Sequence, residues 1–497
     1  MSKNLDQTTA FKRLQALDPT FVWNPKDTAK SLVVDVAYQQ EIRFGHGLTG
    51  LSQATWSVLA ELAQEQQVWD LWADMLAGKP INLGENRGVD HHQTRAKIRG
   101  IYGEIQAQFS AFAMARRNGG LRHLVQMGIG GSELGPQWVA EALAPWAKRH
   151  GKPVVSTSFL TTVDAVDVEA CLSAHPLEET LFVVVSKSGT TAEITTLYRH
   201  VQEKLQALGW SQAAIKDRFV AVTLPGSPLD NPDQFSAIFH LSEAIGGRFS
   251  LTSAVGGVLL SLAYGPEVFE ALLLGAAAMD QTALNRDPFQ NPALLSALYD
   301  VWQFSVCRRS ALAVIPYATA LSHFPHFLQQ VFCESNGKTV NRDGVPIDYP
   351  TAPVVFGDVG TNAQHSFFQL FHQGSAIVPI ELIGVVQPFT TEDTPLQHQL
   401  NANLCGQAIA LVRGQDHLNP NKRFPGRRPV SWLSCTQLAP ETLGALAAFY
   451  ENRVVFQSFL LNINAFDQEG VELGKKLALK GLSGEDGDVA ALFKVFL

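Results

Sequence analysis

A close group of side chains that could bind a ligand lies in the segment Ser186-Lys-Ser-Gly-Thr-Thr191, which carries four hydroxyl side chains and one ammonium within six residues. An apolar run, 181–185, precedes it, and a helical stretch follows. At the end of a buried strand, a helix N-terminus points backbone N–H groups outward, and hydroxyls and a cation complete a cup for an anion. A phosphate suits such a cup, because it offers acceptor oxygens and negative charge. Helix capping is the alternative, but capping needs only one hydroxyl.

A glycine-rich segment, Met127-Gly-Ile-Gly-Gly-Ser132, follows the strand-like residues 123–126. Its glycines allow the backbone to approach a ligand closely. Glu133 stands where the dinucleotide fingerprint has its third glycine, and Pro136 stands where a Walker loop has its lysine, so neither pattern is present. A tight turn explains this segment equally well when it is taken alone.

Three further segments carry side chains suited to proton transfer. Arg248 lies between a glycine pair and a long apolar helix, where a guanidinium either pairs with a carboxylate or stabilises an oxyanion. Glu334 lies at a half-apolar edge, which suits a general base, although a solvated residue at a helix end is the alternative. His365 follows the apolar run 353–356, and it is either an acid–base group or a hydrogen-bonded structural histidine.

The segment Phe466–Lys475 adds two polar candidates. Gln468 and Lys475 are seven residues apart, which is two helical turns, so we expect both side chains near one face of a helix. A surface helix without a catalytic role is the alternative.

A metal site is disfavoured. His323 and His326 could combine with Glu334, but Pro325 lies between the two histidines and the H-E-x-x-H helical spacing is missing. The five cysteines are widely scattered and include no CxxC pair, which favours free thiols in a reducing cytoplasm over a disulfide framework or a zinc site.

The composition sets limits on the classes of protein. At about 150 residues per domain, 497 residues indicate two to four folding units. A hydrophobic content of 46% excludes a disordered chain, and a net charge of −8 argues against nucleic-acid binding, which needs a basic face. The longest uncharged stretch, 310–333, contains two His, two Gln and two Pro, so we expect a strand, a loop and a short helix there rather than a membrane span. We see no signal peptide in the first thirty residues.

The elements that must position these residues follow from the apolar pattern. Residues 1 to about 116 lack strand alternation and are expected to form helices, with helical spacing over 52–76. From residue 121, short apolar runs alternate with helical stretches, which is typical of a parallel sheet covered on both faces. A long helical block, about 254–307, precedes a second set of apolar runs, and helix returns over about 440–461. The chain is therefore predicted to be α/β, with two α/β units joined by helices.

Taken together, these segments resemble the phosphoglucose isomerase (glucose-6-phosphate isomerase) family. The resemblance runs from about residue 78 to residue 475 in the same order. It rests on six motifs: MGIGGSELGP, VVSKSGTT, EAIGGRFSLTSAVG, QQVFCESNGK, GTNAQHSF and FDQEGVELGK. Any one of them could arise by chance, but all six in order are specific.

The resemblance implies a role for each candidate residue. It implies that Glu334 moves a proton between carbons 2 and 1 of the sugar through a cis-enediol, while Arg248 stabilises the negative charge. His365 and Lys475 would assist ring opening, with His365 supplied across a dimer interface. The remaining residues are expected to bind the phosphate or the sugar: Ser186, Lys187, Ser188 and Thr191 at the phosphate, Gly131 and Ser132 near the sugar, and Gln330 and Gln468 at the substrate.

The resemblance also implies an architecture and a reaction. The expected parts are a helical N-terminal region (1–116) packing on the larger domain, two sugar-isomerase (SIS) αβα sandwich domains with parallel-dominated sheets (117–275 and 276–461) and a C-terminal helical arm (462–497). The expected reaction is the reversible conversion of glucose 6-phosphate to fructose 6-phosphate, without cofactor or metal, in a cytoplasmic homodimer that binds neither nucleic acid nor membrane. The competing readings are a non-catalytic sugar-phosphate sensor, a metal-dependent isomerase and, more distantly, a nicotinamide dehydrogenase.

Overall fold

Continuous apolar runs form a five-stranded sheet in the first half of the chain. The computed structural model describes residues 3–95, 100–388, 391–483 and 485–496. Within them, every residue of the three central strands of this sheet is buried, as expected for a sheet covered on both faces. All neighbouring strands are parallel. In spatial order the strands are β4 (Ser156–Leu160), β3 (His123–Met127), β5 (Thr180–Val185), β6 (Phe219–Thr223) and β7 (Ala237–His240).

Alternate residues of the central strands enter different cores. Val183 and Val185 of β5 belong to the large core that also contains α5 and α9, whereas Phe182 and Val184 pack with α6, α7 and α8. This follows from the two-residue period of a strand. The helices of this half are α4 (Ile101–Asn118), α5 (Leu134–Arg149), α6 (Ala165–Ser173), α7 (Ala192–Ala207), α8 (Gln212–Asp217), α9 (Ala254–Tyr264) and α10 (Pro266–Ala283).

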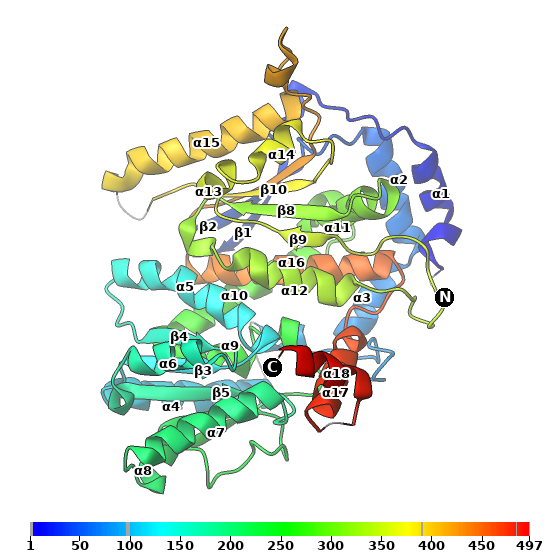
Figure 1. The fold of residues 1–497 in the computed structure, drawn as a ribbon. Helices are drawn as coiled ribbons and strands as arrows, with labels where there is room; N and C mark the ends of the chain where they lie inside the picture. The colour runs from blue at the N-terminus through cyan, green and yellow to red at the C-terminus, as the bar shows by residue number, and fades with distance from the viewer. Residues whose placement is uncertain (1–2, 96–99, 389–390, 484, 497) are drawn as a thin grey trace.

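A second, six-stranded sheet combines two strands from residues 31–45 with four from residues 311–435 (Figure 1). Its four later strands are parallel, and its first two form an antiparallel hairpin at one edge. The spatial order is β1 (Ser31–Ala37), β2 (Gln40–Gly45), β11 (Val430–Cys435), β10 (Ile380–Val385), β8 (Ala311–Pro316) and β9 (Val354–Phe356). The expected α/β class with two parallel-dominated sheets is confirmed.

The hairpin corrects the sequence reading, which predicted only helices in residues 1–116. Val34 and Val36 are buried while Asp35 between them is exposed, so the strand alternates over only a few positions. The turn residues Tyr38 and Gln39 have φ values of 46° and 64°, without the Asn-Gly or Asp-Gly pair that usually marks such a turn. A short alternation without a turn signal is easily missed in a sequence.

The helical stretch 52–76 is also interrupted. Gln67 has φ 54°, which ends one helix and starts the next, so the stretch forms α2 (Gln53–Glu65) and α3 (Val68–Leu76). The other helices are α1 (Thr9–Ala16), α11 (Pro292–Asp300), α12 (Phe324–Asn336), α13 (Gly360–Gln364), α14 (Phe368–Gln373), α15 (Thr394–Arg413) and α16 (Pro440–Leu460). The expected strand, loop and short helix over 310–333 are present as β8, a turn and α12.

Helix α16 joins the two halves. All 21 of its residues are buried, and it packs against α10, α11 and α12 between the sheets (Figure 1). A helix buried on every side must pair its charged residues. Arg453 accordingly forms ion pairs with Asp300 at 2.7 Å and Glu381 at 2.8 Å.

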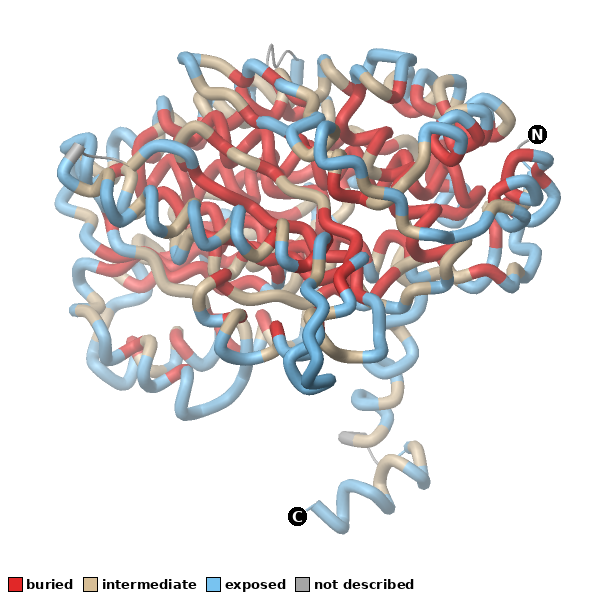
Figure 2. The backbone as a smooth tube through the Cα atoms, turned by 90° about the horizontal axis from the view of Figure 1, so that it is seen from above, coloured by how far each residue is buried: buried red, intermediate tan, exposed pale blue. Residues whose placement is uncertain are grey.

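The C-terminal arm consists of α17 (Glu472–Ser483) and α18 (Gly487–Phe496) and extends away from the body of the molecule (Figure 2). It exposes several large apolar side chains, among them Leu473, Leu492 and Phe496. Among the described helices, none combines the length and the apolarity that a bilayer crossing requires. The division into four parts at residues 116, 275 and 461 stays a prediction.

Candidate active site

The glycine-rich loop after β3 packs against the turn that carries Arg248. Gly130 has φ 61°, in the region that favours glycine. A Cβ atom on Gly131 would lie 2.1 Å from the carbonyl carbon of Gly247, so only glycine allows this approach. The hydroxyl of Ser250 donates to the carbonyl of Gly131 at 3.3 Å. Ser132 is half-buried, and its carbonyl accepts from Gln126 at 2.6 Å.

The hydroxyl segment forms a compact cup between β5 and α7. The Oγ of Ser186 lies 2.9 Å from the Oγ1 of Thr191 and accepts from the N–H of Gly189 at 3.1 Å. The Oγ of Ser188 accepts from the N–H and the hydroxyl of Thr190. Thr191 is the N-cap residue of α7, yet its side chain makes no capping bond. The capping alternative therefore fails for Thr191.

Lys187 links this cup to the Arg248 turn. Its Nζ donates to the carbonyls of Glu243 at 2.7 Å and Ile245 at 2.9 Å, so two of its three N–H groups are used. Burial, together with the nearby Arg87 guanidinium, lowers the pKa of Lys187 to about 8. Among the described residues, its third N–H group has no hydrogen-bond partner, and anion binding by Lys187 stays a prediction.

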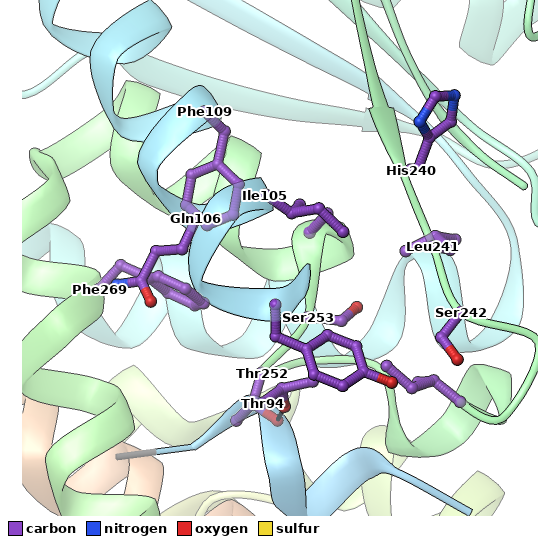
Figure 3. Close-up of a pocket in the computed structure, with 13 residues that line it drawn as sticks. Thr94, Ile105, Gln106, Phe109, His240, Leu241, Ser242, Thr252, Ser253 and Phe269 are labelled. Atoms are coloured by element: carbon purple, nitrogen blue, oxygen red, sulfur yellow. Dashed lines mark hydrogen bonds between the residues drawn. The ribbon is translucent and has the colours of Figure 1, made fainter. Parts of the chain in front are cut away.

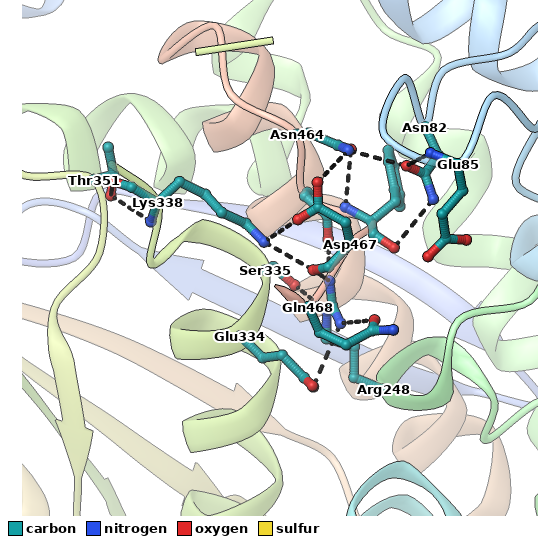
Figure 4. Close-up of polar contacts among 12 residues, drawn as sticks. Asn82, Glu85, Arg248, Glu334, Ser335, Lys338, Thr351, Asn464, Asp467 and Gln468 are labelled. Atoms are coloured by element: carbon teal, nitrogen blue, oxygen red, sulfur yellow. Dashed lines mark hydrogen bonds and ion pairs between the residues drawn. The ribbon is translucent and has the colours of Figure 1, made fainter. Parts of the chain in front are cut away.

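Arg248 is almost completely buried and is held by five donor contacts. Its Nε donates to Ser335 Oγ at 2.8 Å, and its Nη2 donates to the carbonyls of Ala465 and, at 3.0 Å, Asp467. Its Nη1 lies 3.4 Å from the Oε2 of Glu334 and 3.4 Å from the Oε1 of Gln468 (Figure 4). Burial lowers the pKa of this guanidinium, an effect that Glu334 opposes most strongly. The sequence left two roles open for Arg248, pairing with a carboxylate or stabilising an oxyanion. The two roles are compatible, because the carboxylate that it contacts belongs to the candidate base Glu334.

Glu334 lies in the last turn of α12, with 19% of its side chain exposed. Gln330 lies one turn earlier, and its Nε2 is 3.1 Å from where a Cβ of Gly130 would be. The Oε1 of Gln330 is buried and has no hydrogen-bond partner among the described residues. One face of α12 therefore presents an amide and a carboxylate toward the glycine-rich loop and Arg248.

Gln468 and Lys475 do not share a helix, which corrects the expectation of a common face. Gln468 precedes a short 3₁₀ turn, Glu469–Val471, and is itself not helical. Lys475 lies in α17, where 61% of its side chain is exposed and its Nζ pairs with Glu472 at 3.0 Å. Only Gln468 joins the Arg248 cluster.

His365 lies directly after α13 and is exposed. In the described part of the chain, neither His365 nor Lys475 makes a hydrogen bond or ion pair to Glu334, Arg248 or the cup. A single chain therefore assembles the cup, the cation and the carboxylate, and leaves these two residues outside.

Sequence reasoning missed the residues that hold the 464–468 loop. Lys338, Asp467, Asn464 and Asn82 form a connected set of polar contacts beside Arg248 (Figure 4). Lys338 lies in the motif QQVFCESNGK and Asp467 lies in FDQEGVELGK, so the sequence did contain a signal for these two residues. The Glu85 carboxylate raises the pKa of both Lys187 and Arg248, opposing the effect of burial, so one negative charge acts on both the cup and the cluster.

His323, His326 and Glu334, the residues considered for a metal site, do not form one cluster in the described part of the chain. His323 pairs with Glu141 rather than with Glu334, and His326 is exposed. In the ranges that the structure describes, no group of three or more His, Cys, Asp or Glu side chains could hold a metal ion.

A separate small pocket lies beside α4 (Figure 3). Its volume is about 20 Å³, and it is lined by residues of α4, α9 and the neighbouring loops, including Ile105, Ser242 and Thr252. Thr94 and Thr252 bond each other there at 2.7 Å. Such a space holds about one water molecule, so it is no substrate site.

Comparison with known proteins places these residues in a family. A model of the phosphoglucose isomerase family matches residues 49–488. The chain is 40% identical to a glucose-6-phosphate isomerase of Treponema pallidum, over 97% of this chain and 96% of the relative. It is 39% identical to that of Treponema denticola, over 100% and 99%.

The comparison of folds agrees with the comparison of sequences. A crystal structure of a glucose-6-phosphate isomerase from Chlamydia trachomatis matches with a TM-score of 0.91 and 36% identity, over 99% of both chains. The motifs, the two sheets and the cluster around Arg248 thus have one explanation: this chain belongs to the phosphoglucose isomerase family.

Proposed function

We propose that the protein interconverts glucose 6-phosphate and fructose 6-phosphate. The observation that carries the proposal is the pairing of Glu334 with the buried Arg248 guanidinium at 3.4 Å, on a turn that also bonds Lys187 of the cup. Related chains named glucose-6-phosphate isomerase match over nearly their whole length, which supports the same reaction here.

The reaction needs a base and a cation in contact. Glu334 takes the proton from carbon 2 of the open-chain aldose, and the C–H electron pair forms the C1–C2 double bond while the carbonyl oxygen becomes the enediolate oxygen. Arg248 stabilises that negative charge. The proton of the C2 hydroxyl then passes to the C1 oxygen, the C2 oxygen becomes the new carbonyl, and Glu334 returns its proton to carbon 1. One hydrogen moves between the adjacent carbons and one between their oxygens, so the step needs no external oxidant or reductant, and we propose that it runs without cofactor or metal.

Substrate binding is assigned to the groups around this pair. The hydroxyls of Ser186, Ser188 and Thr191, the charge of Lys187 and the N-terminus of α7 bind the phosphate. Gly131 and Ser132 border the sugar, and Gln330 and Gln468 orient it, which the free Oε1 of Gln330 supports. Binding the phosphate away from the reacting carbons supplies orientation.

Ring opening is assigned to His365 and Lys475. Because neither reaches the cluster within one chain, we propose a homodimer in which the site is shared between subunits and His365 comes from the other subunit. The exposed apolar residues of the C-terminal arm support such an association. The five free cysteines support a reducing, cytoplasmic location.

A coupled assay with fructose 6-phosphate tests the assignment. Wild type and Glu334→Gln are compared in EDTA, and binding of the substrate is measured separately by calorimetry. We expect wild-type turnover to survive exhaustive chelation, and Glu334→Gln to lose turnover while it still binds. Near-normal turnover in the variant would refute the assigned base, and turnover lost on chelation and restored by a metal ion would refute the metal-free reaction.

A further inference from the structure

Both carboxylate oxygens of Asp467 are occupied by residues from other parts of the site. Lys338 Nζ donates to Oδ1 at 2.5 Å and also to the carbonyl of Asp467 at 2.8 Å. Asn464 Nδ2 donates to Oδ2 at 2.6 Å (Figure 4). Only 13% of the Lys338 side chain and 20% of the Asp467 side chain is exposed, so solvent screens this ion pair weakly.

The same carbonyl of Asp467 also accepts from Arg248 Nη2 at 3.0 Å. Two cations therefore converge on one peptide group, and they would repel each other without a nearby negative charge. The Asp467 carboxylate supplies that charge. The next residue, Gln468, is the one whose amide oxygen faces Arg248 Nη1, so the position of this peptide group sets the position of Gln468.

Lys338 is fixed to the helix that carries the proposed base. It lies four residues after Glu334, just beyond the end of α12 at Asn336. Its own N–H donates to the Thr351 hydroxyl at 3.2 Å, and its carbonyl accepts from that hydroxyl at 3.1 Å. The lysine thus connects a fixed point at the end of α12 to the 464–468 loop.

Asn82 holds the loop from the opposite side. Its Oδ1 accepts from Asn464 Nδ2 at 3.0 Å, and its Nδ2 donates to the carbonyl of Phe466 at 3.3 Å. The loop is therefore gripped between two segments, and Lys338 provides the only cation other than Arg248 that contacts it among the described residues.

We infer that Lys338 and Asp467 are a positioning pair that holds the 464–468 loop against the end of α12, and so keeps Arg248 and Gln468 at working distance from Glu334. The inference rests on the proposed roles of Glu334 and Arg248. The pair acts through these residues and does not touch the reacting carbons. Among the described residues, neither Lys338 nor Asp467 bonds a residue of the phosphate cup on β5 and α7, so we expect phosphate binding to be largely independent of the pair.

Steady-state kinetics of Lys338→Met test the inference. We expect kcat to fall about 10- to 100-fold, because a small misplacement of groups that act together has this effect, while the KM for fructose 6-phosphate changes far less. Lys338→Arg, which keeps a cation, recovers part of the loss. Lys204→Met is the matched control: it removes a lysine–carboxylate pair with Glu169 between α7 and α6, and leaves kcat unchanged.

A structural role alone would lower the melting temperature of Lys338→Met without changing the kcat of the folded protein, and that result would overturn the inference. Inhibition by inorganic phosphate should stay at the wild-type level, since the cup is intact. If Lys338→Met does not fold, Asp467→Asn replaces it, because this variant keeps the carbonyl and removes the charge; an unchanged kcat there overturns the inference equally.

The outcome is separable from that of the proposed function. An inactive Glu334→Gln together with a fully active Lys338→Met overturns only the positioning pair. An active Glu334→Gln overturns the assigned base, whatever Lys338→Met does.

Discussion

Glu334 and Arg248 lie in the interior between the two halves and are held by neighbours from the same chain, whereas His365 and Lys475 lie on exposed segments. The inner part has what charge stabilisation requires, namely a buried cation fixed by several partners. The outer part has a histidine and a lysine without contacts to that interior in the described ranges. The difference teaches that one chain brings Glu334, Arg248 and the cup together, while the groups proposed for ring opening lie apart from them in that chain.

We expect Arg248→Met, which removes the buried cation beside Glu334, to cause the largest loss of turnover. The variant removes the cation beside Glu334 and the donors that hold the 464–468 loop, so we expect kcat to fall about 10²- to 10³-fold in the coupled assay. Arg116→Met is the control, because it removes a guanidinium that pairs with Asp217 in the first half of the chain. A loss of less than tenfold would contradict the role of Arg248.

His365→Asn tests the proposed role of the exposed His365 in ring opening. We expect kcat to fall about 10²-fold, as for loss of a general acid–base group. If the site is shared, subunit exchange between inactive His365→Asn and Glu334→Gln dimers restores roughly a quarter of wild-type activity, since half of the dimers are mixed and each of these has one intact site. Absence of any recovery after verified exchange would place His365 in the same subunit as Glu334.

Ser186→Ala combined with Thr191→Ala tests the cup. These hydroxyls lie 2.9 Å apart, and their loss should raise the KM for fructose 6-phosphate about tenfold with a smaller change in kcat. Thr195→Ala is the control, since its hydroxyl bonds only the α7 backbone at the Ala192 carbonyl. An unchanged KM would mean that the phosphate binds elsewhere.

The smallest expected effect is a pH dependence of anion binding. The pKa of Lys187 is lowered to about 8 by burial, so the ammonium is charged below pH 8 and loses its proton as the pH rises through that value. Inhibition by sulfate, whose own charge is constant in this range, should weaken several-fold between pH 7 and pH 9. In Lys187→Arg the dependence should disappear, because a guanidinium stays charged; a dependence that persists would assign the titration to another group.

Much of the fold could be predicted from the sequence. The buried strands around Leu181 and Leu312 are continuous apolar runs, and such runs report burial on both faces without knowledge of their neighbours. The β1–β2 hairpin was missed because its alternation is short and its turn residues, Tyr38 and Gln39, are not the usual ones. The break at Gln67 was missed for the same reason: no glycine or proline marks it.

The site divides in a similar way. The hydroxyl cup was predictable, because all its groups lie within six residues. The shared helix face of Gln468 and Lys475 was wrong, because the spacing of two residues does not determine where a helix begins. The role of Lys338 was missed, because its partner Asp467 lies 129 residues away in the sequence.

By itself, the sequence determined the chemical groups that the site can use, the buried apolar strands such as β5 and β8, and the resemblance that indicates the family. The tertiary structure alone decided that Gly131 touches Gly247, that Lys187 turns to the carbonyls of Glu243 and Ile245, and that Asp467 joins Arg248 to Lys338. The physical reason is that strand and helix patterns come from neighbours in the chain. The partner of a buried charge depends instead on which distant segments pack together, and that is set by the burial of the whole core.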